Sequence, residues 1–274
     1  MKLEIPSEID FTDIINHIDV HSNDTLVVFS DINKLALNYR QKGGFNVREF
    51  IDSIQNKLKE GTLLITSFSD DIKDGGEFDY LKTKPTTGAL SKRVFRFKDF
   101  IRTKDPIHSF LVWGKRQKEL IDLEIPSTFG KGSLFEYLHQ INAKMLLIDV
   151  DFQNSFTFIH YIEEMFGVSY RKPYKLNINM VDQNGDSAIK NIIFNTKKFG
   201  VDTYLNDYQK EVLESNSAKT YHFNNSIFYL IDSNKVFDFT FKFLENGGKL
   251  YKMKFKKFFK QIVKKILGYK SPID

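Results

Sequence analysis

A histidine and two glutamates lie inside one of the most apolar stretches of the chain, TFIHYIEEMFGVSYR (Thr157–Arg171). If this stretch is helical, His160 is three and four residues from Glu163 and Glu164, so either carboxylate can reach the imidazole. A carboxylate on one ring nitrogen fixes the tautomer and leaves the other nitrogen free to accept a proton. The spacing therefore permits a general base but does not by itself indicate one. The alternative is a partly buried histidine in a helix-surface ion pair.

Polar loops that follow apolar runs are further candidates for ligand binding. FSDIN (Phe29–Asn33) and TSFSDD (Thr66–Asp71) place hydroxyls and backbone amides directly after two predicted strands. Open α/β sheets bind ligands at that position, although Ser and Asp are also common in loops without such a role. His108 stands at the start of another predicted strand, next to Ser109, and is a further candidate for the site. The alternative is a structural histidine that is hydrogen-bonded to the loop backbone.

The segment PSTFGKGSLFEYL (Pro126–Leu138) combines two glycines with several hydroxyls. Glycines let the backbone approach a ligand closely, and a helix that begins near Ser133 offers amide donors to anionic groups. The segment matches neither the P-loop nor the GxGxxG pattern. Glu136, three residues after Ser133, also predicts a capping box, which needs no ligand.

Strands and helices alternate in the first half of the chain. Thr25–Phe29 and Thr62–Phe68 are predicted strands on either side of a helix at Phe45–Leu58, which is a βαβ unit and favours parallel pairing. Further strands are predicted at Ser109–Trp113 and Lys144–Val150, and further helices at residues 115–122 and 134–140.

The second half contains the clearest turn signal of the chain. Alternating polar and apolar residues flank Asn184-Gly185, which predicts a β-hairpin. A helix is predicted over residues 201–216, a strand at Asn225–Asp232 and a helix at Asn234–Leu244. We therefore expect an α/β domain over residues 1–248: a mostly parallel sheet core flanked by helices, with an antiparallel hairpin addition in the C-terminal half.

Composition restricts the class of protein. The 274 residues are 41% hydrophobic and 15% aromatic, which predicts a folded globular protein. Without cysteine the chain has no disulfide, no thiolate metal site and no cysteine nucleophile, and we expect no metal. No signal-peptide pattern and no run of eighteen apolar residues is visible. These features predict a cytoplasmic protein.

The net charge of +5 arises near the C-terminus. Residues 249–274 contain nine lysines and one acidic residue, which leaves 31 basic and 34 acidic residues for the rest of the chain. A nucleic-acid-binding surface is therefore not expected. Read as a helix, residues 249–274 have one apolar face and a basic remainder, which predicts a basic amphipathic helix. Such a helix could lie on the inner face of a membrane, or pack on the protein or on a partner subunit, which leaves a homo-oligomer open.

Six segments occur together in an order that resembles the aminoglycoside 3-N-acetyltransferase family. They span about residues 24–171 and are Phe29-Ser30, GTLLITSFS, PTTGAL, DPIHSFLVWG, STFGKGSLFEYL and TFIHYIEEMFGVSYR. The resemblance implies an N-acyltransferase that moves an acyl group from acyl-CoA, its co-substrate, to an amine. This family is distinct from the superfamily that includes histone acetyltransferases.

The resemblance also implies roles for individual residues. His160 and Glu163 match the family's His-x-x-Glu helix and would supply the base that deprotonates the acceptor amine, with His108 as a reserve candidate beside the thioester or acceptor. The residues implied to bind coenzyme A are Ser30, Ser67, Phe68, Thr87, Ser109, Phe129, Gly130 and Ser133. Two positions depart from the family pattern: Asp105 replaces a usual histidine, and Phe29-Ser30-Asp31 replaces His-Ser-Ser.

The charge of the segments expected near the acceptor bears on the choice between two acceptor classes, although these charges could equally be solvated loop residues without a ligand. Aminoglycosides are polycations and need an acidic lining. The expected segments carry instead Lys34, Arg40, Lys42, Lys73, Lys82, Lys84, Arg102, Lys104, Arg171 and Lys172. We therefore expect a nucleotide-linked amino sugar, such as a dTDP-3-amino-3,6-dideoxyhexose of surface-polysaccharide (lipopolysaccharide) biosynthesis, with its diphosphate paired to Arg or Lys. The alternatives are an aminoglycoside acceptor, as in antibiotic resistance, and a non-enzymatic membrane- or partner-binding module.

Overall fold

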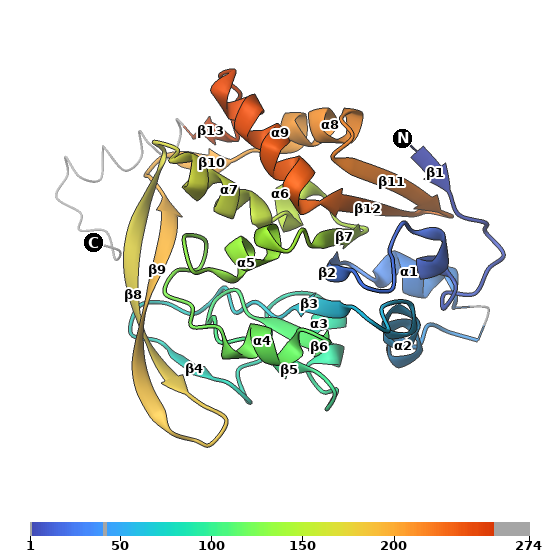
Figure 1. Cartoon of the computed structure of the whole chain (residues 1–274), viewed down its shortest axis with the longest axis horizontal. Coiled ribbons are helices and arrows are strands. Elements are labelled where there is room, and N and C mark those ends of the chain that lie inside the picture. The colour runs from blue at the N-terminus through green and yellow to red at the C-terminus, as the bar shows by residue number, and fades with distance from the viewer. Residues whose placement is uncertain (1, 41–42, 255–274) are drawn as a thin grey trace.

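An eight-stranded mixed sheet with the order β1-β11-β12-β7-β2-β3-β6-β5 forms the centre of the molecule (Figure 1). The computed structural model describes residues 2–40 and 43–254. The strands of this sheet are Lys2–Glu4 (β1), Thr25–Ser30 (β2), Thr62–Thr66 (β3), Ile101–Arg102 (β5), Phe110–Gly114 (β6), Lys144–Ile148 (β7), Ala218–Phe223 (β11) and Ser226–Asp232 (β12).

The expectation of a mostly parallel sheet is wrong. The pairs β1–β11, β2–β3 and β2–β7 are parallel. The pairs β3–β6, β5–β6, β7–β12 and β11–β12 are antiparallel. Strands in the middle of a sheet are apolar on both faces, so their residues carry no signal of direction. Strand β11 was not predicted, and it forms a hairpin with β12 through Asn224, whose φ is 51°.

Alternate residues of the central strands pack into two cores on the two faces of the sheet. Val27 and Leu64 belong to one core, which also takes residues from helices Gln117–Asp122 (α4), Leu134–Gln140 (α5), Phe158–Phe166 (α7) and Ser233–Glu245 (α9). Val28 and Leu63 belong to the other, together with the 3-10 helix Ile14–His17 and helices Asn33–Asn38 (α1), Val47–Lys57 (α2) and Ala89–Val94 (α3). Both layers form because period-two alternation sends neighbouring residues to opposite faces.

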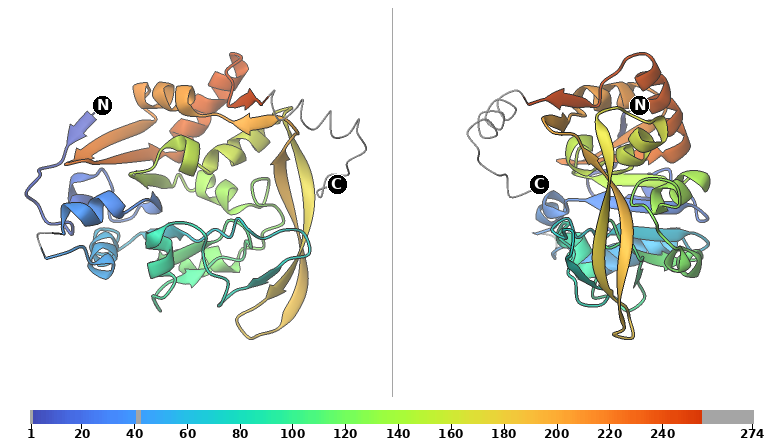
Figure 2. Two further views of the ribbon diagram at one scale, coloured as in Figure 1. Left: turned by 180° about the vertical axis from the view of Figure 1, so that it is seen from behind. Right: turned by 90° about the vertical axis from the view of Figure 1, so that its left-hand side faces the viewer.

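A long twisted hairpin stands beside the central sheet and crosses one side of the molecule (Figure 2). Its strands are Arg171–Val181 (β8) and Ser187–Lys197 (β9), which confirms the hairpin predicted around Asn184-Gly185. Glu77–Asp79 (β4) pairs with β8 and completes a three-stranded sheet. The antiparallel addition is therefore a sheet of its own rather than an extension of the core.

Two segments predicted as helices begin as strands. Val201–Thr203 (β10) pairs with Tyr251–Met253 (β13), so the helix expected from residue 201 is shorter and runs from Asn206 to Glu214 (α8). The helix expected from residue 249 does not start there, and residues 255–274, which carry most of that expectation, lie outside the described part of the chain. Within the described residues, no helix is both long and apolar enough to cross a membrane.

Candidate active site

Helix α7 holds His160 and Glu163 one turn apart, as the sequence predicts. His160 Nδ1 lies 2.8 Å from Glu163 Oε2. The carboxylate is completely buried, whereas 22% of the His160 side chain is exposed. The helix ends at Gly167, which adopts φ 78°, a value that costs a glycine little. The ring therefore has one nitrogen fixed inside the protein and one edge available to a ligand.

Two residues that begin the hairpin close around Glu163. Arg171 Nε lies 2.5 Å from Glu163 Oε2, and the Tyr170 hydroxyl donates to Oε1 at 2.7 Å. Arg171 Nη1 also donates to the backbone carbonyl of Asn195 at 2.8 Å. Both oxygens of the buried carboxylate are thus engaged, which is what a charge inside a protein requires. Arg171 falls within the first motif but was predicted to face the acceptor rather than this carboxylate.

The surroundings keep His160 neutral and Glu163 ionised. Burial is the main cause that lowers the pKa of His160, and the positive charge of Arg171 lowers it further. Burial would raise the pKa of Glu163, but the hydrogen bond with His160 and the charge of Arg171 together outweigh it, so this pKa lies below its usual value. A neutral imidazole can accept a proton at neutral pH, which is the property that a general base needs.

Glu164, the second glutamate in reach by spacing, does not contact the imidazole. Its carboxylate lies against Gly130, where an added Cβ would come within 2.3 Å of Glu164 Oε1. Burial raises the pKa of Glu164 above its usual value. The family resemblance implied that Gly130 binds coenzyme A. The structure adds a second reason for glycine at this position: any side chain there would collide with the Glu164 carboxylate.

His108 is close to His160 but separated from it by an aromatic ring. The Phe129 ring centre lies 4.9 Å from that of His108 and 5.2 Å from that of His160. Phe68 contacts His108 from another direction at 4.7 Å. Burial among these rings lowers the pKa of His108 to about 3, and a charge on His160 would lower it further. His108 therefore stays neutral and is a weak proton acceptor.

The loops expected to bind coenzyme A meet at one end of the strands. Ser67 N donates to Ser109 O, and Thr86 N donates to Phe68 O. A Cβ on Gly88 would lie 3.0 Å from Ser30 O, which places the Thr87 loop against the end of β2. Five of the implied residues therefore come from one cluster of loops, namely Ser30, Ser67, Phe68, Thr87 and Ser109.

Several buried polar atoms in these loops have no partner within the described residues. They are the hydroxyls of Ser67 and Thr87 and the Nδ1 atom of His108. Buried polar groups are nearly always hydrogen-bonded, so such atoms indicate where a ligand can supply the missing partner. The amide and hydroxyl groups of an acyl-pantetheine chain are partners of this kind. The loop cluster thus fits an acyl-CoA in chemistry as well as in position.

Arg102 ties the same loops together. Its guanidinium donates to Ser67 O, to Thr83 O, to the Ser109 hydroxyl and to the Ser69 hydroxyl, at 2.6 to 3.0 Å. Burial lowers the pKa of Arg102 to about 10. Because Ser109 also donates to Ser67 O at 2.6 Å, its hydroxyl is engaged inside the protein. Ser109 therefore shapes the loops through these bonds.

Ser133 and Asp105 also make contacts within the protein. Ser133 accepts a hydrogen bond from Glu136 N at 3.1 Å, and the Glu136 carboxylate accepts one from Gly132 N at 2.7 Å, so a capping arrangement does start α5. Asp105, which replaces a histidine of the family pattern, accepts from the backbone of Ile107 and His108. Burial raises the pKa of Asp105. The Asp105 carboxylate therefore stabilises the loop that carries His108 through these two hydrogen bonds.

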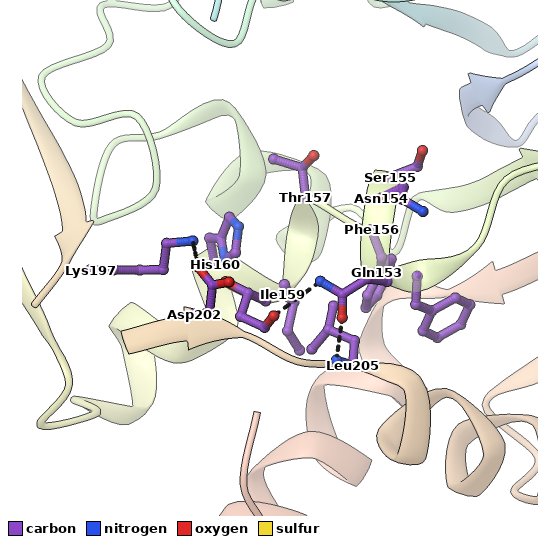
Figure 3. Close-up of a pocket in the computed structure, with 12 residues that line it drawn as sticks. Gln153, Asn154, Ser155, Phe156, Thr157, Ile159, His160, Lys197, Asp202 and Leu205 are labelled. Atoms are coloured by element: carbon purple, nitrogen blue, oxygen red, sulfur yellow. Dashed lines mark hydrogen bonds and ion pairs between the residues drawn. The ribbon is translucent and has the colours of Figure 1, made fainter. Parts of the chain in front are cut away.

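A pocket of about 280 Å³ opens beside His160 (Figure 3). Its walls come from α7, from the preceding short helix Phe152–Ser155 (α6), from the end of β9 and from β10. Ser155 and Thr157 contribute hydroxyls, while Lys197 and Asp202 contribute charges. Sequence reasoning missed Lys197 and Asp202 because they lie on strands about 40 residues beyond the helix motif.

The basic residues expected near the acceptor are mostly elsewhere. Arg171 contacts the His160–Glu163 pair, but none of the ten residues lines this pocket within the described chain. Lys34 is paired with Asp149, and Lys104 with Glu124. Lys42 lies outside the described residues. The described residues of this set are therefore not placed to pair with a diphosphate in this pocket. No cluster of three or more metal-binding side chains occurs in the described residues either.

Comparison with known proteins identifies the class. The sequence profile of the aminoglycoside 3-N-acetyltransferase family matches residues 36–245, so the chain belongs to this family. The chain is therefore an acyl-CoA-dependent N-acyltransferase, as the six sequence segments predicted. No curated protein matches the chain.

Solved structures of low sequence identity share the fold. The structure titled "AAC-IIIb binary with CoASH" is 15% identical, with 87% of this chain and 96% of that chain covered and a TM-score of 0.70. AAC-VIa bound to sisomicin is 15% identical over 87% and 97% of the two chains, also with a TM-score of 0.70. The YokD protein from Bacillus subtilis is 18% identical over 86% and 97%, with a TM-score of 0.68. The family match favours the aminoglycoside alternative over the nucleotide-linked sugar that we expected from the charges.

Proposed function

We propose that this protein transfers an acyl group from acyl-CoA directly to a primary amine of an aminoglycoside-type acceptor, that is, an amino-sugar compound. The observation that carries the proposal is the position of His160, whose imidazole is fixed by Glu163 on one side and lines a polar pocket on the other. Family membership supports the reaction class. The polar lining of the pocket supports an acceptor with hydroxyl groups.

In the proposed reaction His160 acts as the general base. Its Nδ1–H donates to Glu163, and Nε2 takes the proton that converts the acceptor ammonium into a neutral amine. The amine attacks the thioester carbonyl, the C–N bond forms and the C–S bond breaks. The second proton, which the nitrogen loses on becoming an amide, passes to the departing sulfur, so coenzyme A leaves as the thiol and His160 returns its own proton to solvent. A positioned base typically contributes about 10²–10⁴ in rate, and holding both substrates in one site contributes more.

The loop cluster around Ser67 and Thr87 would hold the acyl-CoA with its thioester next to the acceptor pocket. Phe129 is buried and touches both histidines. In this arrangement His108 contributes to the wall of the thioester site and does not exchange protons. No covalent acyl-enzyme is needed, because the chain has no cysteine and the amine can reach the thioester directly.

A thiol-release assay tests the proposal. Acetyl-CoA and longer acyl-CoAs are supplied with two acceptor panels, aminoglycosides and nucleotide-linked amino sugars. We expect coenzyme A release with at least one aminoglycoside and acylated product by mass spectrometry. Release only with nucleotide-linked sugars would reverse the choice of acceptor. Failure of folded protein to bind any acyl-CoA in calorimetry would reject the reaction class.

A further inference from the structure

The acceptor pocket contains one carboxylate whose two oxygens are both paired with lysines of the chain itself. Lys197 Nζ lies 3.6 Å from Asp202 Oδ1 (Figure 3), and Lys254 is ion-paired with Oδ2. The hydrogen bond with Lys254 is the main cause that lowers the pKa of Asp202 below its usual value, and Lys197 adds to it. Asp202 is therefore charged at neutral pH, and each of its oxygens already faces a lysine.

The charged side chains around the pocket do not favour a cationic ligand. Apart from His160, Lys197 and Asp202 are the ionisable side chains that line it, as far as the described residues extend. With Lys254 the local sum is two positive charges and one negative charge. Glu163 adds nothing for a ligand, because it is completely buried and paired with Arg171. Among the charged residues that line the pocket and their ion-pair partner Lys254, positive charge is thus in excess by one.

We propose that Lys197 and Lys254 compete with the acceptor for Asp202 and thereby make the enzyme prefer acceptors of low positive charge, amino sugars with one or few amines, over those with many. This inference rests on the proposed N-acyl transfer. The reacting amine must be neutral when it attacks, so it needs no carboxylate. Each additional ammonium that enters the pocket does need a counter-ion. Asp202 can supply one only after a lysine has been displaced.

The rest of the pocket suits a single hydroxyl-rich ring. Ser155 and Thr157, which line the same pocket as His160, contribute uncharged hydroxyls. The volume of about 280 Å³ lies just below the range of roughly 300–1,000 Å³ that is usual for small-molecule sites. A compound of several rings with many amines would therefore exceed this volume, and its amines near Lys197 would meet the excess of positive charge.

The selection is graded rather than absolute because the ion pairs are partly solvated. The side chains of Lys197, Lys254 and Asp202 are 40%, 49% and 36% exposed. Ion pairs of this exposure are weak and exchange readily. Removing one lysine should therefore change the preference between acceptors by a factor of a few, without creating or abolishing activity.

The test compares two acceptors of different charge, glucosamine with one amine and apramycin with several. The quantity measured is the ratio of kcat/KM for apramycin to kcat/KM for glucosamine. Lys197→Gln should raise this ratio about fivefold, the upper end of what a partly exposed pair contributes. Asp202→Asn should lower it. Lys210→Gln is the matched control, since Lys210 is an exposed lysine paired with Asp207 on α8 and its loss changes the net charge equally.

Each outcome bears on one of the two proposals. An unchanged ratio in folded Lys197→Gln, or the same rise in Lys210→Gln, overturns the inference and leaves N-acyl transfer intact. A rise in the ratio for Asp202→Asn overturns it as well. If the wild-type protein releases no coenzyme A with either acceptor or with the wider panels, although it binds acyl-CoA, the proposed function fails and the inference fails with it.

Discussion

Arg171 Nη2 lies 2.6 Å from His160 Nδ1, so a guanidinium and a carboxylate meet at the same imidazole nitrogen. Arg171 can only donate hydrogen bonds, whereas Glu163 can only accept them when ionised. Arg171 therefore opposes a positive charge on the ring, and Glu163 favours a proton on Nδ1. Burial and Arg171 keep the imidazole neutral. The carboxylate favours the tautomer with a proton on Nδ1, whereas the guanidinium at the same nitrogen opposes it.

Replacement of the base should affect turnover and leave acyl-CoA binding intact. We expect His160→Ala to lower kcat by about 10² or more, the contribution of one positioned general base. Steady-state kinetics give kcat, and calorimetry gives the acyl-CoA affinity. His21→Ala is the matched control because His21 is an exposed histidine far along the chain from the motif. Normal turnover in His160→Ala would exclude it as the base.

Removal of the guanidinium should shift the pH profile. Arg171 lowers the pKa of His160, so Arg171→Met should raise this pKa, and the acidic limb of kcat/KM should move to higher pH. Arg171→Lys keeps a positive charge and should shift the limb less. This readout separates an effect on the imidazole from a loss of stability, because lower stability reduces the amount of active protein but does not move the limb. A limb that stays in place contradicts the assignment.

Glu163 should matter for stability as well as for activity. Glu163→Gln leaves Arg171 buried without a full counter-charge and should lower the free energy of unfolding by about 3 kcal/mol. The pKa of Glu163 lies below its usual 4.5, so its contribution is present above that value and is lost as the pH falls through the lower folded-state pKa. Denaturant unfolding should therefore show a lower free energy of unfolding for Glu163→Gln than for the wild type at pH 7, and this difference should become smaller below pH 4.5. Glu119 forms an exposed ion pair with Arg116, so the control variant Glu119→Gln should have almost the same free energy of unfolding as the wild type.

His108 should contribute to acid sensitivity. Its pKa is about 3 in the folded protein and near 6.5 when unfolded, so the unfolded chain binds the extra proton first. Stability then decreases as the pH falls from 6.5 towards 3. His108→Phe keeps an aromatic ring beside Phe68 and Phe129 and should flatten this dependence. An equally steep dependence in the variant, measured by urea unfolding at several pH values, would mean that His108 does not titrate in this way.

Gly130 and Glu164 should be coupled. The Cβ of Gly130→Ala would meet Glu164 Oε1 at 2.3 Å, so this variant should lose about 1–3 kcal/mol of stability. Glu164→Ala removes the obstructing carboxylate, and the double variant should recover part of the loss, because Ser127 Oγ would still lie 2.9 Å from the added Cβ. A double-mutant cycle from unfolding curves measures the coupling. Additive effects would show that the glycine is needed for another reason.

The sequence predicted the helix motif well because its information is local. Helical periodicity places His160 beside Glu163 whatever the rest of the fold does, and the turn residues at Asn184-Gly185 specify their hairpin in the same way. Strand direction has no local signal, which is why β6 was not recognised as antiparallel. The partners of Asp202 could not be predicted either, since Lys197 and Lys254 meet it only after β9, β10 and β13 have come together.

The proposed base and the charged residues of the acceptor pocket lie on different parts of the fold. The proposed base lies on a helix packed against the central core, whereas Lys197 and Asp202 lie on the hairpin and on the small β10–β13 pair. Exchange of residues on these outer strands can alter the acceptor while the chemical step stays as it is. A library restricted to the pocket-facing positions of β9 and β10 is therefore the natural starting point for evolving new acceptor ranges on this scaffold.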